Sequence, residues 1–192
     1  MNSESETLSL EELGESQKKE LKEIAAKAIE SRVTGKKSEI KVTDRILKKK
    51  AGVFVTINRF GQLRGCIGYI LPFYELWEAT AKAAAEAAVS DPRFISIDKD
   101  EIGTLEIEIS VLGELEQIEP KKPGVLDNLK IGLEGLVVTG HETSGILLPQ
   151  VATEFGFSAM EFLQATCEKA GLSIDAWNDP VVSVYKFAAK IF

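Results

Sequence analysis

The sequence predicts an α+β fold with mixed or antiparallel sheets and flanking helices. The clearest strand covers residues 104–112, where apolar residues alternate with polar ones, as in a half-buried strand. Two further apolar segments, 52–57 and 63–70, are separated by a short run of turn residues, which predicts a hairpin. Because the best strands are linked by hairpins, a doubly wound parallel sheet is disfavoured.

The N-terminal part predicts a tail and one long helix. Residues 1–7 are polar and acidic, and we expect a flexible tail there. Ser9 and Glu12 form a capping box, and apolar residues follow at helical spacing. The helix therefore begins at Ser9 or at Ser16, and Gly35 is expected to end it.

The next segment is basic and leads into the hairpin and a second helix. Residues 36–50 are rich in lysine, which favours a solvated connection over a basic rim for an anionic ligand. After the hairpin, Pro72 is expected to open an alanine-rich helix that ends near Ser90. Small side chains would let this helix lie close to the sheet.

The C-terminal part predicts a second group of short elements. Pro120–Gly124 contains two prolines and a glycine, and it is the predicted boundary between two lobes. Strands are expected at 135–139 and 145–148. A capping box and a terminal glycine define a helix within 158–171, and residues 181–192 predict a final strand.

Composition excludes several classes of protein. The chain has 192 residues, with 23 basic and 30 acidic residues and a net charge of −7. That charge disfavours a general nucleic-acid binder, and two cysteines cannot form a disulfide scaffold. We expect a cytoplasmic protein without a membrane segment, because no apolar run is long enough to span a bilayer. No zinc, calcium or nucleotide motif is present, so neither a metal nor a cofactor is predicted.

The segment Leu63–Gly68, with the sequence Leu-Arg-Gly-Cys-Ile-Gly, is the strongest candidate in the chain for a functional motif. Arg64 and Cys66 are expected on the same strand face, where a guanidinium favours the thiolate and makes it more reactive. Gly65 and Gly68 would let a ligand or another backbone approach closely. The alternative is a structural cysteine whose neighbouring glycines serve a bulge.

This segment resembles the signature of the AMMECR-one family. The resemblance covers roughly residues 8–192 in one register, as a single domain. Further blocks similar to the family follow the signature or precede it: Gly52–Thr56, Asp91–Phe94, Ile109–Leu112, Leu148–Val151, Phe162-Leu163, Lys169–Leu172 and Trp177.

The resemblance implies a two-lobed fold whose signature lines a cleft between the lobes. It nominates Arg64, Gly65, Cys66 and Gly68 from the signature, and Asp91 and Arg93 from the second block. The two arginines would suit a carboxylate or phosphate. Alternatively, Asp91 pairs with one arginine as a purely structural bond.

Two functions follow as hypotheses. The first is binding of a small anionic ligand, or of a segment of an unidentified protein partner, in the cleft lined by Leu63–Gly68. The second is an enzyme with Cys66 as its catalytic nucleophile. Similar prokaryotic proteins are commonly grouped with a Memo-like and a radical-SAM protein, which implies a shared modification pathway. Glu108 is a weaker candidate for a general base, and His141 is expected in a surface loop.

Overall fold

The computed structural model describes residues 7–192, which fall into two compact units. Unit 1 runs to Gly113 and includes Lys190–Phe192, and unit 2 is Glu114–Ala189. The division precedes the Pro120–Gly124 segment predicted as the boundary, because the strand Glu116–Ile118 already pairs within unit 2. The predicted tail of residues 1–7 lies outside the described residues except for Thr7, which forms a bridge with Lys50.

Unit 1 is an α+β unit that contains the hairpin and both long helices. Its elements are η1 (Leu10–Glu12), α1 (Glu15–Thr34), β1 (Gly52–Arg59), β2 (Gln62–Tyr69), α2 (Leu76–Val89), η2 (Lys99–Thr104) and β3 (Leu105–Leu112). The Ser9–Glu12 capping box is present, but it caps the short η1 turn and not α1. Gly35 ends α1 in the left-handed conformation, as predicted.

The sheet of unit 1 has the strand order β2-β1-β3, and both strand pairs are antiparallel. The predicted hairpin is confirmed, and its two-residue loop is Phe60-Gly61. A register shift between Ile57 and Asn58 interrupts the β1–β2 ladder. This bulge changes which side chains of β2 share a face, and it therefore decides the geometry around Cys66.

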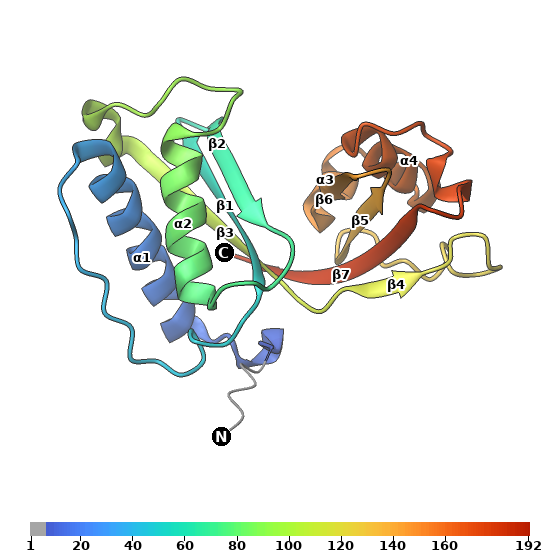
Figure 1. Cartoon of the computed structure of the whole chain (residues 1–192), viewed down its shortest axis with the longest axis horizontal. Coiled ribbons are helices and arrows are strands. Elements are labelled where there is room, and N and C mark those ends of the chain that lie inside the picture. Colours follow the sequence, from blue (N-terminus) through green and yellow to red (C-terminus); the bar gives the residue numbers. More distant parts are fainter. Residues whose placement is uncertain (1–6) are drawn as a thin grey trace. The chain divides into compact units, whose positions relative to one another are not determined.

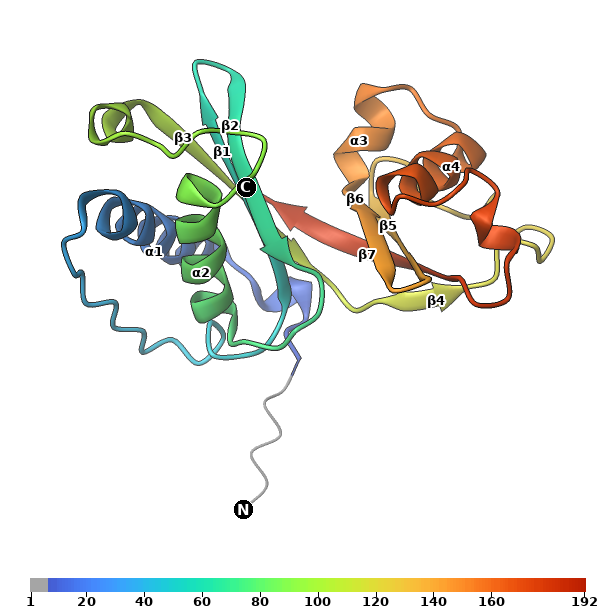
Figure 2. The same ribbon diagram turned by 45° about the horizontal axis from the view of Figure 1, so that its top comes forward.

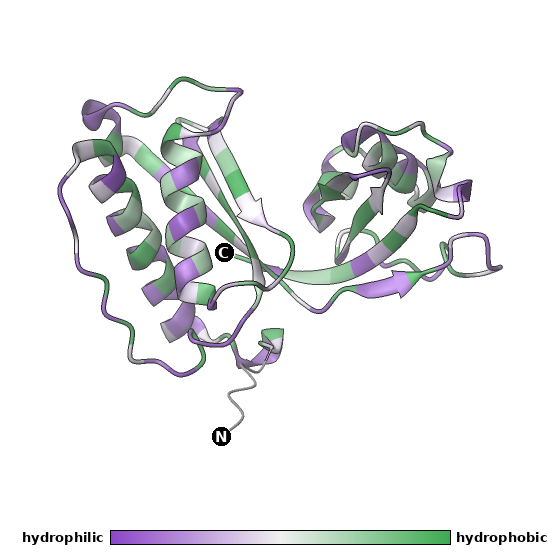
Figure 3. Cartoon of the chain, in the orientation of Figure 1, coloured by the Kyte–Doolittle hydropathy of each residue, from purple (hydrophilic) through white to green (hydrophobic). Residues whose placement is uncertain are grey.

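Helices α1 and α2 lie side by side over one face of this sheet (Figures 1 and 2). Purple and green residues alternate along both helices (Figure 3), as expected for helices that bury one face. The buried face of α2 consists largely of alanines, among them Ala83, Ala84, Ala87 and Ala88. Small side chains there allow the close approach between helix and sheet that the sequence predicted.

Helix α2 begins at Leu76 and not at Pro72. The N–H of Leu76 donates to the carbonyl of Lys49 at 2.8 Å, and the N–H of Trp77 donates to Leu47 at 3.1 Å. The first N–H groups of a helix lack partners inside the helix. Residues 47–49 supply those partners here, which ties the basic connection to the start of α2.

Unit 2 combines a second antiparallel sheet with two helices. Its elements are β4 (Glu116–Ile118), β5 (Glu134–Gly140), β6 (Thr143–Leu147), α3 (Pro149–Glu154), α4 (Ala159–Lys169), η3 (Ala176–Asn178) and most of β7 (Ser183–Ile191). The strand order is β7-β5-β6, and β4 pairs with β7. The predicted capping box of Ser158 and Glu161 starts α4, and the core contains Phe162, Leu163 and Cys167. The sequence did not predict β4 or α3.

Among the helices of residues 7–192, none combines the length and the apolar character needed to cross a membrane.

Candidate functional site around Cys66

Cys66 lies on the face of the unit 1 sheet that points away from the helices. It pairs with Thr56 of β1, and Thr56 pairs in turn with Glu108 of β3. The hydroxyl of Thr56 donates a hydrogen bond to the Cys66 Sγ at 3.2 Å. Residues directly opposite on antiparallel strands project from the same face. Cys66, Thr56 and Glu108 therefore form one row across three strands.

The buried side chain of Asp91 holds the backbone of Cys66. Its carboxylate accepts from the Cys66 N–H at 2.8 Å. It also accepts from three N–H groups of Arg93, namely the backbone N at 3.1 Å, Nε at 2.9 Å and Nη2 at 2.7 Å. The Arg93 bonds, with a further contribution from the Cys66 N–H, hold the pKa of Asp91 well below its usual range.

Arg93 completes the contact from the other side of the same peptide. Its Nη2 also lies 3.4 Å from the Cys66 carbonyl oxygen. Its hydrogen bonds to Asp91 raise the pKa of Arg93 above the ordinary value, and the neighbouring Cys66 side chain adds to that effect. The Asp91 side chain is 2% exposed, whereas that of Arg93 is 48% exposed. The ion pair therefore buries its negative partner and leaves its positive partner at the surface beside the thiol.

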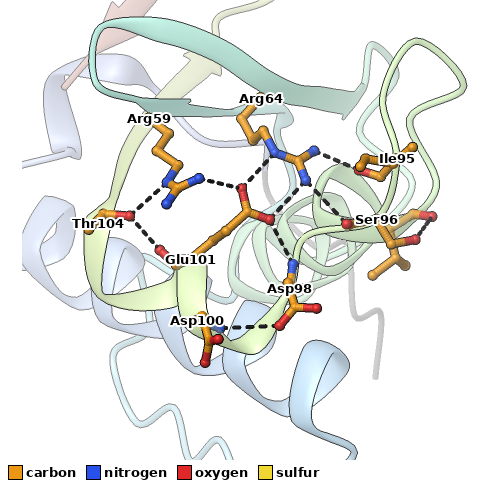
Figure 4. A network of polar contacts seen from close by, with 9 residues as sticks. Arg59, Arg64, Ile95, Ser96, Asp98, Asp100, Glu101 and Thr104 are labelled. Carbon is orange, nitrogen blue, oxygen red and sulfur yellow. Dashed lines mark hydrogen bonds and ion pairs between the residues drawn. The ribbon is translucent and has the colours of Figure 1, made fainter.

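Arg64 belongs to a different network, at the end of the hairpin (Figure 4). Its Nε and Nη2 both donate to the Glu101 carboxylate at 3.0 Å. Its Nη1 donates to the Ile95 carbonyl at 2.6 Å, and Nη2 also donates to the Ser96 carbonyl at 3.1 Å. Arg59 joins through a bond from Nη1 to Glu101 at 3.1 Å. Each nitrogen of the Arg64 guanidinium thus has a protein acceptor.

Glu101 is the acceptor that unites the two arginines of this network. Its bidentate bond from Arg64, together with the N–H of Asp98, lowers the pKa of Glu101 to about 2. Arg64 and Glu101 are only 15% and 14% exposed in their side chains. The sequence predicted Arg64 as the neighbour of the Cys66 thiol. Because of the bulge, Arg64 binds Glu101 instead, and Arg93 is the arginine that lies beside the thiol.

The two nominated glycines are in close contact with protein atoms. A Cβ added at Gly65 would lie 2.1 Å from the Ala87 carbonyl oxygen of α2. A Cβ at Gly68 would lie 2.4 Å from the Phe54 ring and 2.4 Å from the Val53 carbonyl oxygen. Backbone and ring atoms therefore account for both glycines. Their predicted contact with a ligand stays a prediction.

The comparisons with known proteins agree with the resemblance seen in Leu63–Gly68. A family model described as AMMECR1 matches residues 22–192. The chain belongs to the AMMECR1 family. "Protein TK0174" from Thermococcus kodakarensis is 48% identical over 151 residues, covering 76% of this chain and 74% of the relative. A Methanothermobacter thermautotrophicus protein is 43% identical over 176 residues, covering 90% of this chain and 91% of the relative.

A crystal structure of a similar protein supports the AMMECR1 fold directly. "Uncharacterized Protein PH0010" from Pyrococcus horikoshii aligns with a TM-score of 0.82 and 46% sequence identity. The alignment covers 89% of this chain and 88% of that chain. The α+β fold class expected from the sequence is therefore confirmed.

For this AMMECR1 chain, the structure brings together Cys66, Asp91 and Arg93 and separates Arg64 from them. Sequence reasoning missed Thr56 and Glu101. Hairpin pairing could have indicated Thr56, but a regular two-residue loop would place it opposite Gly65, and only the bulge moves it to Cys66. No pattern in the sequence indicates Glu101.

Other candidate residues lie elsewhere or have ordinary roles. His141, in the β5–β6 turn, lies 3.0 Å from an Asp179 carboxylate oxygen through its Nε2. Cys167 is fully buried, and burial raises the pKa of its thiol. Within the described chain, no three His, Cys, Asp or Glu side chains are grouped so that they could hold a metal ion.

Proposed function

We propose that this protein binds a small anionic ligand at the Cys66–Arg93 surface, defined as the thiol of Cys66, the guanidinium of Arg93 and the hydroxyl of Thr56. One observation carries the proposal. The Asp91 carboxylate is buried, and four N–H groups already donate to it. Its partner Arg93 keeps about half of its side chain exposed. A carboxylate or phosphate oxygen docking there gains a charge-assisted hydrogen bond next to the thiol.

The chain itself provides a reporter for this surface. Cys66 is partly exposed and Cys167 is buried, and the chain has two cysteines in all. Alkylation of the folded protein therefore reports on Cys66. The rate with anionic iodoacetate is compared with the rate with neutral iodoacetamide. The ratio of the two rates measures how strongly the surface attracts an anion.

Replacing Arg93 should lower this ratio. A unit charge about 4 Å away contributes about 1 kcal/mol in water, which corresponds to about a fivefold change in rate. We expect Arg93→Gln to lower the ratio by about fivefold, and Arg93→Lys to lower it less because lysine keeps the charge. Arg64→Lys is the matched control, since Arg64 is bound to Glu101, and it should leave the ratio unchanged.

Protection by anions tests binding itself. Phosphate, sulfate and citrate are used as probes, with chloride at the same ionic strength as control. At least one probe should slow iodoacetamide labelling of wild type and fail to slow labelling of Arg93→Gln. An unchanged ratio in Arg93→Gln, together with no protection by any probe, would show that the surface does not bind anions.

A second candidate is an enzyme that uses Cys66 as its nucleophile. The observation favouring it is that the Thr56 hydroxyl donates to the partly exposed sulfur while the Arg93 guanidinium lies beside it. A strain lacking the protein is complemented with wild type or with the nearly isosteric Cys66→Ser. Loss of complementation by folded Cys66→Ser supports catalysis, and full complementation excludes it. Under this second candidate function, the enzyme would act in the same modification pathway as Memo-like and radical-SAM proteins.

A further inference from the structure

A cavity of unit 1 lies at the loop end of the β1–β2 hairpin, apart from the Cys66–Arg93 surface. Its volume is about 330 Å³, at the lower end of the range for sites that hold small ligands. Its lining shares no residue with the Cys66–Arg93 surface and consists of Arg59, Phe60, Gln62, Leu63, Arg64 and Glu101. A ligand in this cavity would therefore be bound independently of an anion beside Cys66.

Phe60 is an unusual residue for its position in the hairpin loop. Its backbone has a φ of +52°, a left-handed conformation that costs free energy for a residue with a bulky side chain. Phe60 gains little burial in return, because it is 72% exposed. Leu63, which also lines the cavity, is 40% exposed. Backbone strain and exposed apolar side chains both tend to occur at binding sites.

Arg59 provides the cavity with a hydrogen-bond donor that is still free. Its Nε donates to the Thr104 hydroxyl at 2.9 Å, and its Nη1 donates to Glu101 at 3.1 Å (Figure 4). Its Nη2 has no hydrogen-bond partner among residues 7–192. Each nitrogen of Arg64, in contrast, donates to a protein acceptor. Arg59 is therefore the arginine of this network that can donate to a ligand.

The free donor and the apolar surface lie next to each other. The guanidinium carbon of Arg59 is 4.9 Å from the centre of the Phe60 ring, so a molecule bonded to Arg59 can also contact the ring. Two arginines and one glutamate line the cavity, which leaves it locally positive. Four N–H groups from Arg59, Arg64 and Asp98 already donate to the Glu101 carboxylate. The oxygens of Glu101 are thus occupied by protein donors.

We propose that this cavity binds a small molecule in which one carboxylate is attached to an apolar body, either an aromatic ring or a short alkyl chain. The carboxylate accepts a charge-assisted hydrogen bond from the Arg59 Nη2, and the apolar body packs against Phe60 and Leu63. A single free donor suits a carboxylate better than a phosphate dianion. A protein interface normally uses about 20–30 residues on each side, whereas six line this cavity, so a small molecule is the better fit.

Protein-observed NMR with the full chain tests this site. Benzoate, phenylacetate and hexanoate are the probes. We expect at least one of these acids to shift the signals of the Arg59 Nε–H group and of the Phe60 ring. The amide of the tightest acid lacks the charge, and acetate lacks the apolar body. Both control compounds should bind at least about tenfold more weakly than that acid, because each loses one of the two contacts.

Variants of the lining separate the site from general electrostatics. Arg59→Gln should weaken the tightest acid by about tenfold. Arg45→Gln removes the same charge from an exposed residue outside the cavity, and it should leave the affinity unchanged. Phe60→Asn should also weaken binding by about tenfold without lowering Tm, because asparagine suits the left-handed loop position. Loss of binding in that variant would therefore not result from unfolding.

Three results would overturn the proposal. The first is that none of the three acids shifts a signal of the cavity lining. The second is equal affinity for the acid and either control compound, or equal affinity of Arg59→Gln and Arg45→Gln for the acid. The third is binding that is lost in Arg93→Gln but kept in Arg59→Gln, which would assign the acid to the Cys66–Arg93 surface.

Discussion

Replacing Gly65 with alanine tests whether the signature glycines serve packing or a ligand. The added Cβ would lie 2.1 Å from the Ala87 carbonyl oxygen and 3.0 Å from the Ala87 carbonyl carbon. Cβ contacts below 3.0 Å essentially never occur in proteins. Strand β2 and helix α2 would have to separate by about 1 Å, and closely packed interiors resist such a shift.

The cost follows from the kind of atoms that clash. Overpacking of a well-packed core typically costs about 1–3 kcal/mol. Both clashing groups at Gly65 are backbone, so no side chain can rotate away, and we expect a loss of about 3 kcal/mol. For a chain of this length, each kcal/mol lowers Tm by about 2–4 °C. The expected decrease in Tm is therefore about 6–12 °C.

Urea unfolding followed by circular dichroism measures this loss. Gly103→Ala is the matched control, because no atom lies within 4 Å of a Cβ built at Gly103 and its φ is not positive. The control should change the free energy of unfolding by less than about 1 kcal/mol. If Gly65→Ala were as stable as the control, close packing against Ala87 would not explain the glycine, and a ligand contact would become the better explanation.

Two further predictions concern residues near the hairpin. The pKa of Asp91 is depressed in the folded state. The ionised carboxylate therefore contributes fully to the free energy of unfolding above the ordinary carboxyl pKa of about 4. This contribution is lost as the pH falls toward the folded-state pKa. In urea unfolding from pH 6 to pH 2, Asp91→Asn should be about 2–3 kcal/mol less stable than wild type near neutrality, and the difference should shrink in acid. Phe60 has a φ of +52° ahead of Gly61 at +73°, a loop geometry that favours Asn-Gly. Phe60→Asn should therefore raise stability by about 0.5 kcal/mol, after the loss of the Arg59 stacking contact is counted, and a destabilised variant would contradict this.

The elements predicted correctly are those whose signals are local. The alternation of β3, the left-handed Gly35 and the capping box at Ser158 each depend on a few neighbouring residues. Helix α3 and strand β4 have six and three residues, too few for a periodic pattern to indicate them. Tertiary contacts, and not local preference, define such short elements.

Only those residues of the candidate site that lie within short sequence motifs could be predicted from the sequence. The motifs nominate Cys66, Asp91 and Arg93, but the partners of each side chain depend on the bulge in the hairpin. Strict alternation along β2 would place the Arg64 and Cys66 side chains on the same face. The one extra residue in β2 at the bulge changes this, and Arg64 binds Glu101 instead. The bulge places Gly65 opposite Ile57 with its backbone close to α2, and such a contact between distant segments is not encoded in the local sequence.

The Asp91–Arg93 pair explains why the two motifs form one structural unit. Strand β2 is an edge strand, and an unpaired edge invites pairing with other chains. Asp91 accepts from the N–H of Cys66, and Arg93 approaches its C=O, so the two side chains take the places of a neighbouring strand's acceptor and donor. This contact fixes the peptide of Cys66 while leaving its thiol on the sheet face. The same two residues can therefore form a structural ion pair and also contribute to a functional surface. Experiments that separate these two roles must probe the exposed part of the Arg93 side chain.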